Sequence, residues 1–502
     1  MSNGNPTMVA YTAPRREIYA WAIGGVATHA LICTYGQAMN IFTVGFGLNA
    51  AVVGWAMMLP RVIDAIADPF LGHLSDNTHT RWGRRKPFLI LGAGLASLFI
   101  FLLWWGDSTW SHTAQLVYLT ILGTLFYTSW GLYSMAWTAL GYELTDDYNE
   151  RSRVAALAGV VTAVVLLANA WVYWFALRPL FKNGVIDTVR SLFSKGLDWA
   201  HMSGVLDASF RTVPGAVSNE VNGIRWITCF VVVISVSAAI YATKNCKERF
   251  SKSNTQHTPI GVALKATFKN RPFMTLMLFK LCQVFGERVF QGLLFFIGIY
   301  YVCQGDKNFA TKITGQAGLF SILVSFMVLP LIKPISQNLG KRAGLIIPSV
   351  VALVLILVQP LVLTPEHPYL LLIPLLVLSP LSIISNAMIA SIVPDICDLD
   401  ELEHGNRREG LFTSVVAFMG KLEISLSVLI VGYLVTFSGL DQKIAKQAPE
   451  VLQKLLWLAI GPGIFFTFFA LLMALRFRMN EATMVEIRQK LDSRRAAESL
   501  PS

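Results

Sequence analysis

The sequence predicts an all-α membrane protein whose twelve transmembrane helices form two six-helix bundles. The 502 residues are 54% hydrophobic and only 14% charged, so the chain lacks the polar surface that a soluble protein of this size requires. Twelve segments are apolar and long enough to cross a hydrocarbon core of about 30 Å. These expected spans cover approximately residues 19–45, 50–72, 87–106, 114–140, 154–177, 222–243, 272–302, 313–334, 343–364, 368–393, 411–437 and 453–475.

A basic segment, residues 244–271, divides the spans into two sets of six. The turn Gly340-Lys341-Arg342 follows the eighth span as Gly83-Arg84-Arg85 follows the second, which indicates an internal repeat. We therefore expect four parts: an N-terminal bundle (1–246), a cytoplasmic linker (247–271), a C-terminal bundle (272–480) and a cytoplasmic tail (481–502).

The distribution of basic residues predicts the orientation. With the N-terminus inside, most of the 41 Lys and Arg residues fall on the cytoplasmic side, as they do in membrane proteins generally. Both termini are then cytoplasmic, and we expect a multi-pass protein of the cell membrane, specifically a bacterial inner membrane. The first 16 residues lack the apolar core of a secretory signal, so no cleavage is expected. The net charge of +11 reflects topology and contact with anionic lipid, and nucleic acid is not an expected partner.

The second span ends with two carboxylates, Asp64 and Asp68. Carboxylates inside a membrane span are costly and are usually functional. At i and i+4 they lie about 40° apart around a helix, so both face the same space. The pair predicts a site for a small cation.

The first and fourth spans carry polar and aromatic stripes. In the first span, a stripe that includes Gln37 and Asn40 fits either a close helix–helix contact or the wall of a water-filled cavity. In the fourth, Trp130 and Tyr133 share a face with Trp137. Aromatic stripes of this kind serve packing, interfacial anchoring or binding, and the pattern alone does not choose between them.

The seventh span is unusually polar. Lys280, Gln283 and Glu287 stand at i, i+3 and i+7, with Arg288 beside them. One interpretation is an internal ion pair, with Glu287 bonded to Lys280 or to a neighbouring helix. The other is a substrate site that contains fixed positive charge.

Three motifs in three corresponding loops support a family resemblance. They are the run from Arg61 to Phe88 (RxxDAxxDPxxGxxSDxxxxRWGRRKPF), the loop ALGYELTDDYNER at 139–151, and the segment 394–412 that begins Pro-Asp-Ile-Cys-Asp. Together they resemble the glycoside-pentoside-hexuronide:cation symporters, the melibiose-permease-like branch of the major facilitator superfamily. The resemblance implies two six-helix bundles, a cation site between the second and fourth spans, and alternating access around a central sugar site.

The resemblance also implies roles for single residues. Asp64 and Asp68 match the carboxylates that ligate the coupling cation, and Lys421 matches a lysine of the eleventh span, which we expect to compete with the cation for them. The acidic sugar contacts of melibiose-type members are missing, because Tyr133 or Ser134 stands at the fourth-span position. Because the seventh span adds Lys280 and Arg288, and an anionic sugar needs a fixed cation, we favour an anionic sugar. The expected substrate contacts are Gln37, Asn40, Trp130, Tyr133, Lys280, Gln283 and Arg288.

Charged cytoplasmic loops are the expected gates. Basic residues after the second span and a mixed cluster after the tenth could form salt bridges across the cytoplasmic face or could serve topology alone. The residues concerned are Arg81, Arg84, Arg85, Asp395, Asp398, Arg407 and Arg408.

These observations predict a monomeric cation-coupled symporter that imports a glycoside or hexuronide, with sodium and proton both left open. The alternatives are a proton-coupled disaccharide carrier, a carrier of a lipid-like solute, and a membrane sensor or enzyme. No nucleophile motif, metal-ligand spacing or nucleotide-binding loop occurs, so neither an enzyme nor a cofactor beyond the coupling ion is expected. The six cysteines show no paired spacing, and the external loop 178–221 fits a lid, a lipid contact or an insertion.

Overall fold

A computed structural model describes most of the chain. The described residues are 13–78, 80–106, 110–145, 148–178, 181, 219–248, 270–404, 409–442, 444, 446–477, 486–487, 489–491 and 493. They form helices without a strand. Twelve of these helices are long and apolar enough to cross a membrane, which confirms the predicted spans and the all-α fold class.

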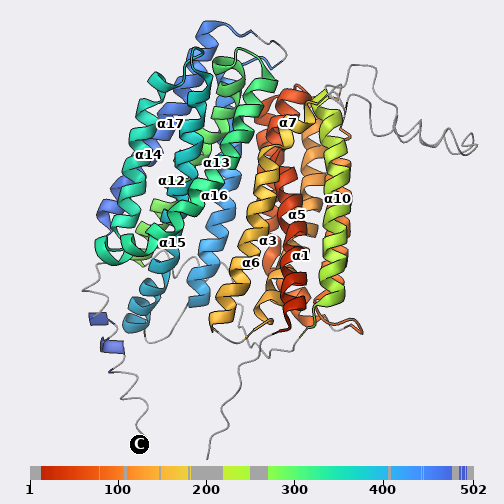
Figure 1. Cartoon of the computed structure of the whole chain (residues 1–502), viewed down its shortest axis with the longest axis vertical. Coiled ribbons are helices and arrows are strands. Elements are labelled where there is room, and N and C mark those ends of the chain that lie inside the picture. The colour runs from red at the N-terminus through yellow and green to blue at the C-terminus, as the bar shows by residue number, and fades with distance from the viewer. Residues whose placement is uncertain are drawn as a thin grey trace, which may run out of the picture. The chain divides into compact units, whose positions relative to one another are not determined.

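The described helices belong to two compact units, Met1–Thr255 and Gln256–Ser502, with six spans in each (Figure 1). The dividing point lies within the predicted linker 247–271. Residues 249–269 of that linker, most of the loop 178–221 and most of the tail 481–502 lie outside the described residues.

The first unit contains α1 (Arg15–Gly36), which α2 (Ala38–Asn40) and a π-helical turn η1 (Ile41–Gly45) continue. The other helices are α3 (Ala50–Asn77), α4 (Lys86–Leu103), α5 (His112–Tyr142), α6 (Tyr148–Ala170), the short α7 (Val172–Ala176) and α10 (Asn219–Asn245). α1 packs against α10, α6 and α5.

An interlocked pair of tryptophans joins α1 to α5. The rings of Trp21 and Trp137 stack with centroids 4.8 Å apart, and each indole N–H donates a 2.8 Å hydrogen bond to the other residue's carbonyl. A Cβ at Gly25 would lie 3.0 Å from the Trp137 ring, so the absent side chain allows the close approach. Trp137 is therefore a packing residue whose indole N–H, buried in the bundle, is satisfied by backbone.

The second unit contains α12 (Arg271–Ile297) with the π turn η3 (Gly298–Val302), and α13 (Lys307–Pro334) with the π turn η4 (Ile335–Leu339). It continues with α14 (Ala343–Val362), the 3₁₀ turn η5 (Pro368–Leu371), α15 (Leu372–His404), α16 (Glu409–Ser438) and α17 (Pro449–Arg476). α12 packs against α17 and α16. A Cβ at Gly286 would overlap the Thr467 hydroxyl oxygen, so glycine lets α12 and α17 touch.

Candidate functional site

The two carboxylates of α3 share one space beside α5. The Asp64 side chain is buried and Asp68 is half-buried. A Cβ placed on Gly131 of α5 would lie 3.1 Å from Asp64 Oδ1 and 3.9 Å from Asp68 Oδ1. The missing side chain of Gly131 therefore leaves room at the place where the two carboxylates converge.

This arrangement suits a small, hard cation. Carboxylate oxygens are the ligands that such ions prefer, and two of them supply two negative charges to one site. Within the described ranges, no cluster of three or more His, Cys, Asp or Glu side chains could hold a metal ion. The remaining oxygens for a cation at Asp64 and Asp68 would then come from backbone, neutral side chains or water.

Arg61, the first residue of the motif that contains the two carboxylates, lies one turn before this pair. The Arg61 guanidinium lies 4.9 Å from the centroid of the Tyr127 ring, and its Nη1 donates a 3.3 Å hydrogen bond to the Tyr127 hydroxyl. Tyr127 in turn contacts the rings of Tyr35 and Trp130 edge-on, at 4.8 and 6.2 Å between centroids. The carboxylate pair is thus flanked by a guanidinium and by an aromatic wall built from α1 and α5.

Of the predicted substrate contacts in the first unit, Trp130 belongs to this wall, and its indole N–H donates to the Thr28 carbonyl at 2.9 Å. Gln37 donates to Asn169 of α6 at 3.1 Å, so it links α1 to α6, and Asn40 is half-buried on α2.

Tyr133 does not fit its predicted role as a substrate contact. Its ring is fully buried in the helix packing, and its hydroxyl donates to the Gly24 carbonyl at 2.7 Å. We therefore assign Tyr133 to the packing of α5 on α1. The stripe of aromatic residues on α5 divides into a packing part, Tyr133 and Trp137, and a part beside the carboxylates, Tyr127 and Trp130.

The polar stripe of α12 forms a network inside the second unit. Lys280 Nζ lies 3.1 Å from Glu423 Oε1 of α16, and both side chains are largely buried. Glu287 is buried and accepts hydrogen bonds from Gln283, at 3.3 Å, and from the Ser382 hydroxyl of α15. The stripe therefore joins three helices, and the ion pair that the sequence suggested for Lys280 is made with Glu423 rather than Glu287.

Two further basic residues of this region, Arg288 and Lys421, are less buried than Lys280 or lie on another helix. Arg288 is exposed and follows the buried Glu287 directly in α12. Lys421 is half-buried on α16, two residues before Glu423. Its competition with a cation stays a prediction.

Three of the predicted gate residues, Arg84, Arg85 and Asp395, have an ion-pair partner in their own unit. Arg84 and Arg85 reach Glu143, just after α5, at 3.3 and 2.5 Å. In the second unit Lys341 reaches Asp395 of α15 at 2.5 Å. Arg81 lies over the ring of Trp82, Asp398 is half-buried on α15, and Arg407 and Arg408 lie outside the described residues. In each unit, a basic turn thus bonds an acidic residue in, or just after, the second helix that follows the turn. This agrees with the predicted internal repeat.

The basic turn of the first unit also holds an acidic residue that the sequence analysis did not single out. The Glu248 carboxylate accepts hydrogen bonds from the backbone N–H groups of Arg84, Arg85 and Lys86, at 2.6, 2.9 and 2.7 Å. These are the free N–H groups at the start of α4, where a negative charge is favoured. Gly83 has φ +110°, and a Cβ there would lie 2.6 Å from the same carboxylate.

We expect Glu248→Gln to destabilise the protein by about 2 kcal/mol, because a charged acceptor of three N–H groups becomes a neutral one. The measurement is thermal unfolding in detergent. Glu486→Gln is the control, since Glu486 is exposed and bonds only its neighbour Lys490 in the described structure, at 2.6 Å, and such pairs contribute little. Equal melting temperatures for the two variants would contradict the assignment.

Comparison with known proteins agrees with this architecture. A family described as MFS/sugar transport protein matches residues 20–481. The uncharacterized symporter YnaJ of Bacillus subtilis is 25% identical over 95% of each chain. The glucuronide carrier protein homolog of Escherichia coli is 24% identical over 65% of this chain and 63% of its own. The isoprimeverose transporter of Lactiplantibacillus pentosus is 22% identical over 85% and 81%.

Solved structures share the fold at low identity. The nucleoside transporter NupG gives a TM-score of 0.56 at 12% identity, covering 93% of this chain and 99% of its own. The D-xylose–proton symporter gives 0.53 at 12% identity, with 90% and 96% covered. At this identity the likeness establishes the helical architecture alone.

Proposed function

The chain belongs to the MFS/sugar transport family, and from this premise we propose that it is a cation-coupled symporter in which Asp64 and Asp68 bind the coupling ion. The observation that carries the proposal is the convergence of two membrane-embedded carboxylates on the space left by Gly131. Coupling requires that cation and sugar occupy or leave the carrier together, so that transport follows the ion gradient.

The substrate that we propose is an acidic sugar. Among the described residues, Lys280 is neutralised by Glu423, but neither Arg61 nor Arg288 has a carboxylate within ion-pair distance. A guanidinium offers the planar fork that binds a carboxylate with two parallel hydrogen bonds. The aromatic wall of Tyr35, Tyr127 and Trp130 beside Arg61 offers a surface on which a sugar ring can stack. A relative of this chain is named as a glucuronide carrier homolog, which supports the same substrate class.

The test is uptake into proteoliposomes that contain the purified protein. A labelled methyl glucuronide and the matched methyl glucoside are supplied with an inward sodium gradient, an inward proton gradient, or neither. The proposal expects accumulation of the glucuronide above equilibrium with one of the two gradients. Uptake of the glucuronide that neither gradient changes would overturn the coupling. Accumulation of the glucoside alone would overturn the substrate class.

Conservative replacement tests the two guanidinium groups. Arg61→Lys and Arg288→Lys keep the charge and lose the fork, so we expect the variant of the binding residue to lower the apparent affinity for the glucuronide about tenfold. Arg342→Lys is the control, because Arg342 donates to the Ala474 and Leu475 carbonyls at the end of α17 and is not a predicted substrate contact. Unchanged affinity in both variants would assign Arg61 and Arg288 to structural roles.

A further inference from the structure

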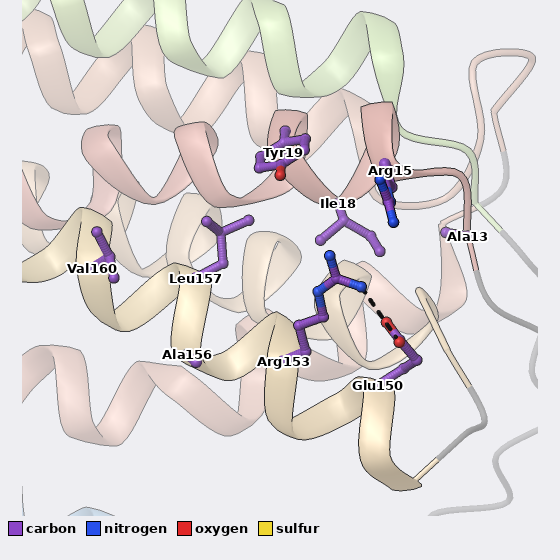
Figure 2. A pocket seen from close by; sticks show the side chains of 9 residues that line it. All are labelled: Ala13, Arg15, Ile18, Tyr19, Glu150, Arg153, Ala156, Leu157 and Val160. Carbon is purple, nitrogen blue, oxygen red and sulfur yellow. Dashed lines mark ion pairs between the residues drawn. The ribbon is translucent and has the colours of Figure 1, made fainter.

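A cavity of about 550 Å³ lies between the first turns of α1 and α6, within the first unit. The residues of α6 that line it are Glu150, Arg153, Ala156, Leu157 and Val160 (Figure 2). The opposite wall consists of Ala13 and of Arg15, Ile18 and Tyr19 of α1. None of these residues belongs to the cation site, the aromatic wall or the α12 network.

Two matching stripes build this cavity. On α1, Arg15, Ile18 and Tyr19 stand at i, i+3 and i+4, and on α6, Arg153 is followed by Leu157 and Val160 at i+4 and i+7. Residues at these spacings share one face of a helix. Each stripe thus starts with arginine and continues with apolar side chains.

The stripes run from the membrane boundary into the membrane. Arg15 and Arg153 are the first residues of two of the apolar spans. Val160 lies seven residues further along α6, which is about 10 Å deeper at a rise of 1.5 Å per residue. One end of the cavity is therefore cationic and the other is a hydrocarbon surface.

Among the described residues that line the cationic end, the side-chain charges do not balance. Arg153 lies 3.6 Å from Glu150, which is a loose pair, and Figure 2 shows both guanidinium groups pointing into the space between α1 and α6. In the part of the chain that the structure describes, Glu150 pairs with Arg153 and the Arg15 guanidinium makes no hydrogen bond or ion pair. Two guanidiniums and one carboxylate leave a net positive charge, and arginine forks bind phosphate well.

The apolar end also lacks cover from the protein. Tyr19 is 50% exposed and Val160 is 54% exposed. A ligand that covers these side chains and neutralises the arginines must carry an anionic head group and a hydrocarbon chain on one molecule.

We propose that this cavity is a binding site for one anionic glycerophospholipid, with its phosphate on Arg15 and Arg153 and an acyl chain along Ile18, Leu157 and Val160. The predicted cytoplasmic location of this end agrees with the leaflet in which juxtamembrane basic residues meet anionic lipid. The proposal is independent of the transported solute.

The experiment counts bound phosphatidylglycerol by native mass spectrometry, after release of the protein from nanodiscs of phosphatidylcholine with increasing phosphatidylglycerol. Wild-type protein should retain one molecule. Arg15→Gln and Arg153→Gln should each weaken its retention about fivefold, as expected for one basic residue at a membrane surface. Arg16→Gln is the matched control, because Arg16 is an exposed neighbour that does not line the cavity.

A second variant tests the apolar end. Ala156 is exposed, so Ala156→Trp should leave the fold intact, fill the cavity and prevent retention of phosphatidylglycerol with both arginines present. Equal retention of phosphatidylcholine, an equal loss in Arg16→Gln, or unchanged retention in Ala156→Trp would each overturn the proposal. So would displacement of the lipid by soluble glycerol 3-phosphate, because the cavity would then recognise only the phosphate.

Discussion

Replacement of Asp64 or Asp68 by asparagine is expected to abolish gradient-driven accumulation of the sugar while the protein stays folded. Removal of one of two converging carboxylates takes away half of the negative charge that balances the ion. A loss of about 3 kcal/mol, the low end for breaking a buried charge pair, corresponds to a cation affinity about 100-fold weaker. The measurement is the cation concentration that gives half-maximal uptake of the sugar. Exchange of the sugar down its own gradient, which does not need coupling, shows whether the variant is still a folded carrier.

The control for this prediction is Asp306→Asn. Asp306 caps α13 by accepting a 3.0 Å hydrogen bond from the Phe309 N–H, and asparagine caps a helix nearly as well. Wild-type accumulation in both Asp64→Asn and Asp68→Asn would remove the pair from the mechanism.

Gly131 offers an independent test of the same site without a change of charge. The Cβ that Gly131→Ala adds would lie 3.1 Å from Asp64 Oδ1 and crowd it. The affinity for the cation should therefore fall although both carboxylates are still present. Gly94→Ala is the matched control, because a Cβ there meets nothing within 4 Å. Equal behaviour of the two variants would show that the space beside Gly131 is not used by the ion.

Loss of Glu423 is expected to produce the largest change in stability. Glu423→Gln leaves the Lys280 ammonium largely buried without its carboxylate, which costs about 3–5 kcal/mol. The double variant Lys280→Met, Glu423→Leu removes both charges and replaces them by apolar groups of similar length, so it should recover most of that loss. Thermal unfolding of Lys280→Met, Glu423→Leu and the double variant that combines them measures the coupling between the residues.

Lys490→Met provides the comparison for this cycle. Lys490 makes an exposed pair with Glu486, four residues before it, and its loss should change the melting temperature little. If Glu423→Gln behaves like Lys490→Met, or if the double variant is no more stable than Glu423→Gln, then the Lys280–Glu423 contact does not hold α12 to α16.

The sequence by itself determined the twelve spans, because the thickness of the bilayer fixes how long an apolar helix must be. It also determined that Asp64 and Asp68 share a face, since helical geometry places i and i+4 together. Both results depend on local regularities that can be read along a single segment.

Only the tertiary structure decided what each face contacts. Tyr133 and Trp130 lie on one stripe of α5, but the rotation and neighbours of that helix bury Tyr133 against Gly24 and place Trp130 beside Tyr127. Lys280 pairs with Glu423, which is far away in the chain, rather than with Glu287 two turns along its own helix. Helical periodicity shows which residues point the same way, whereas the partner that they meet depends on which helices pack together, and no single segment contains that information.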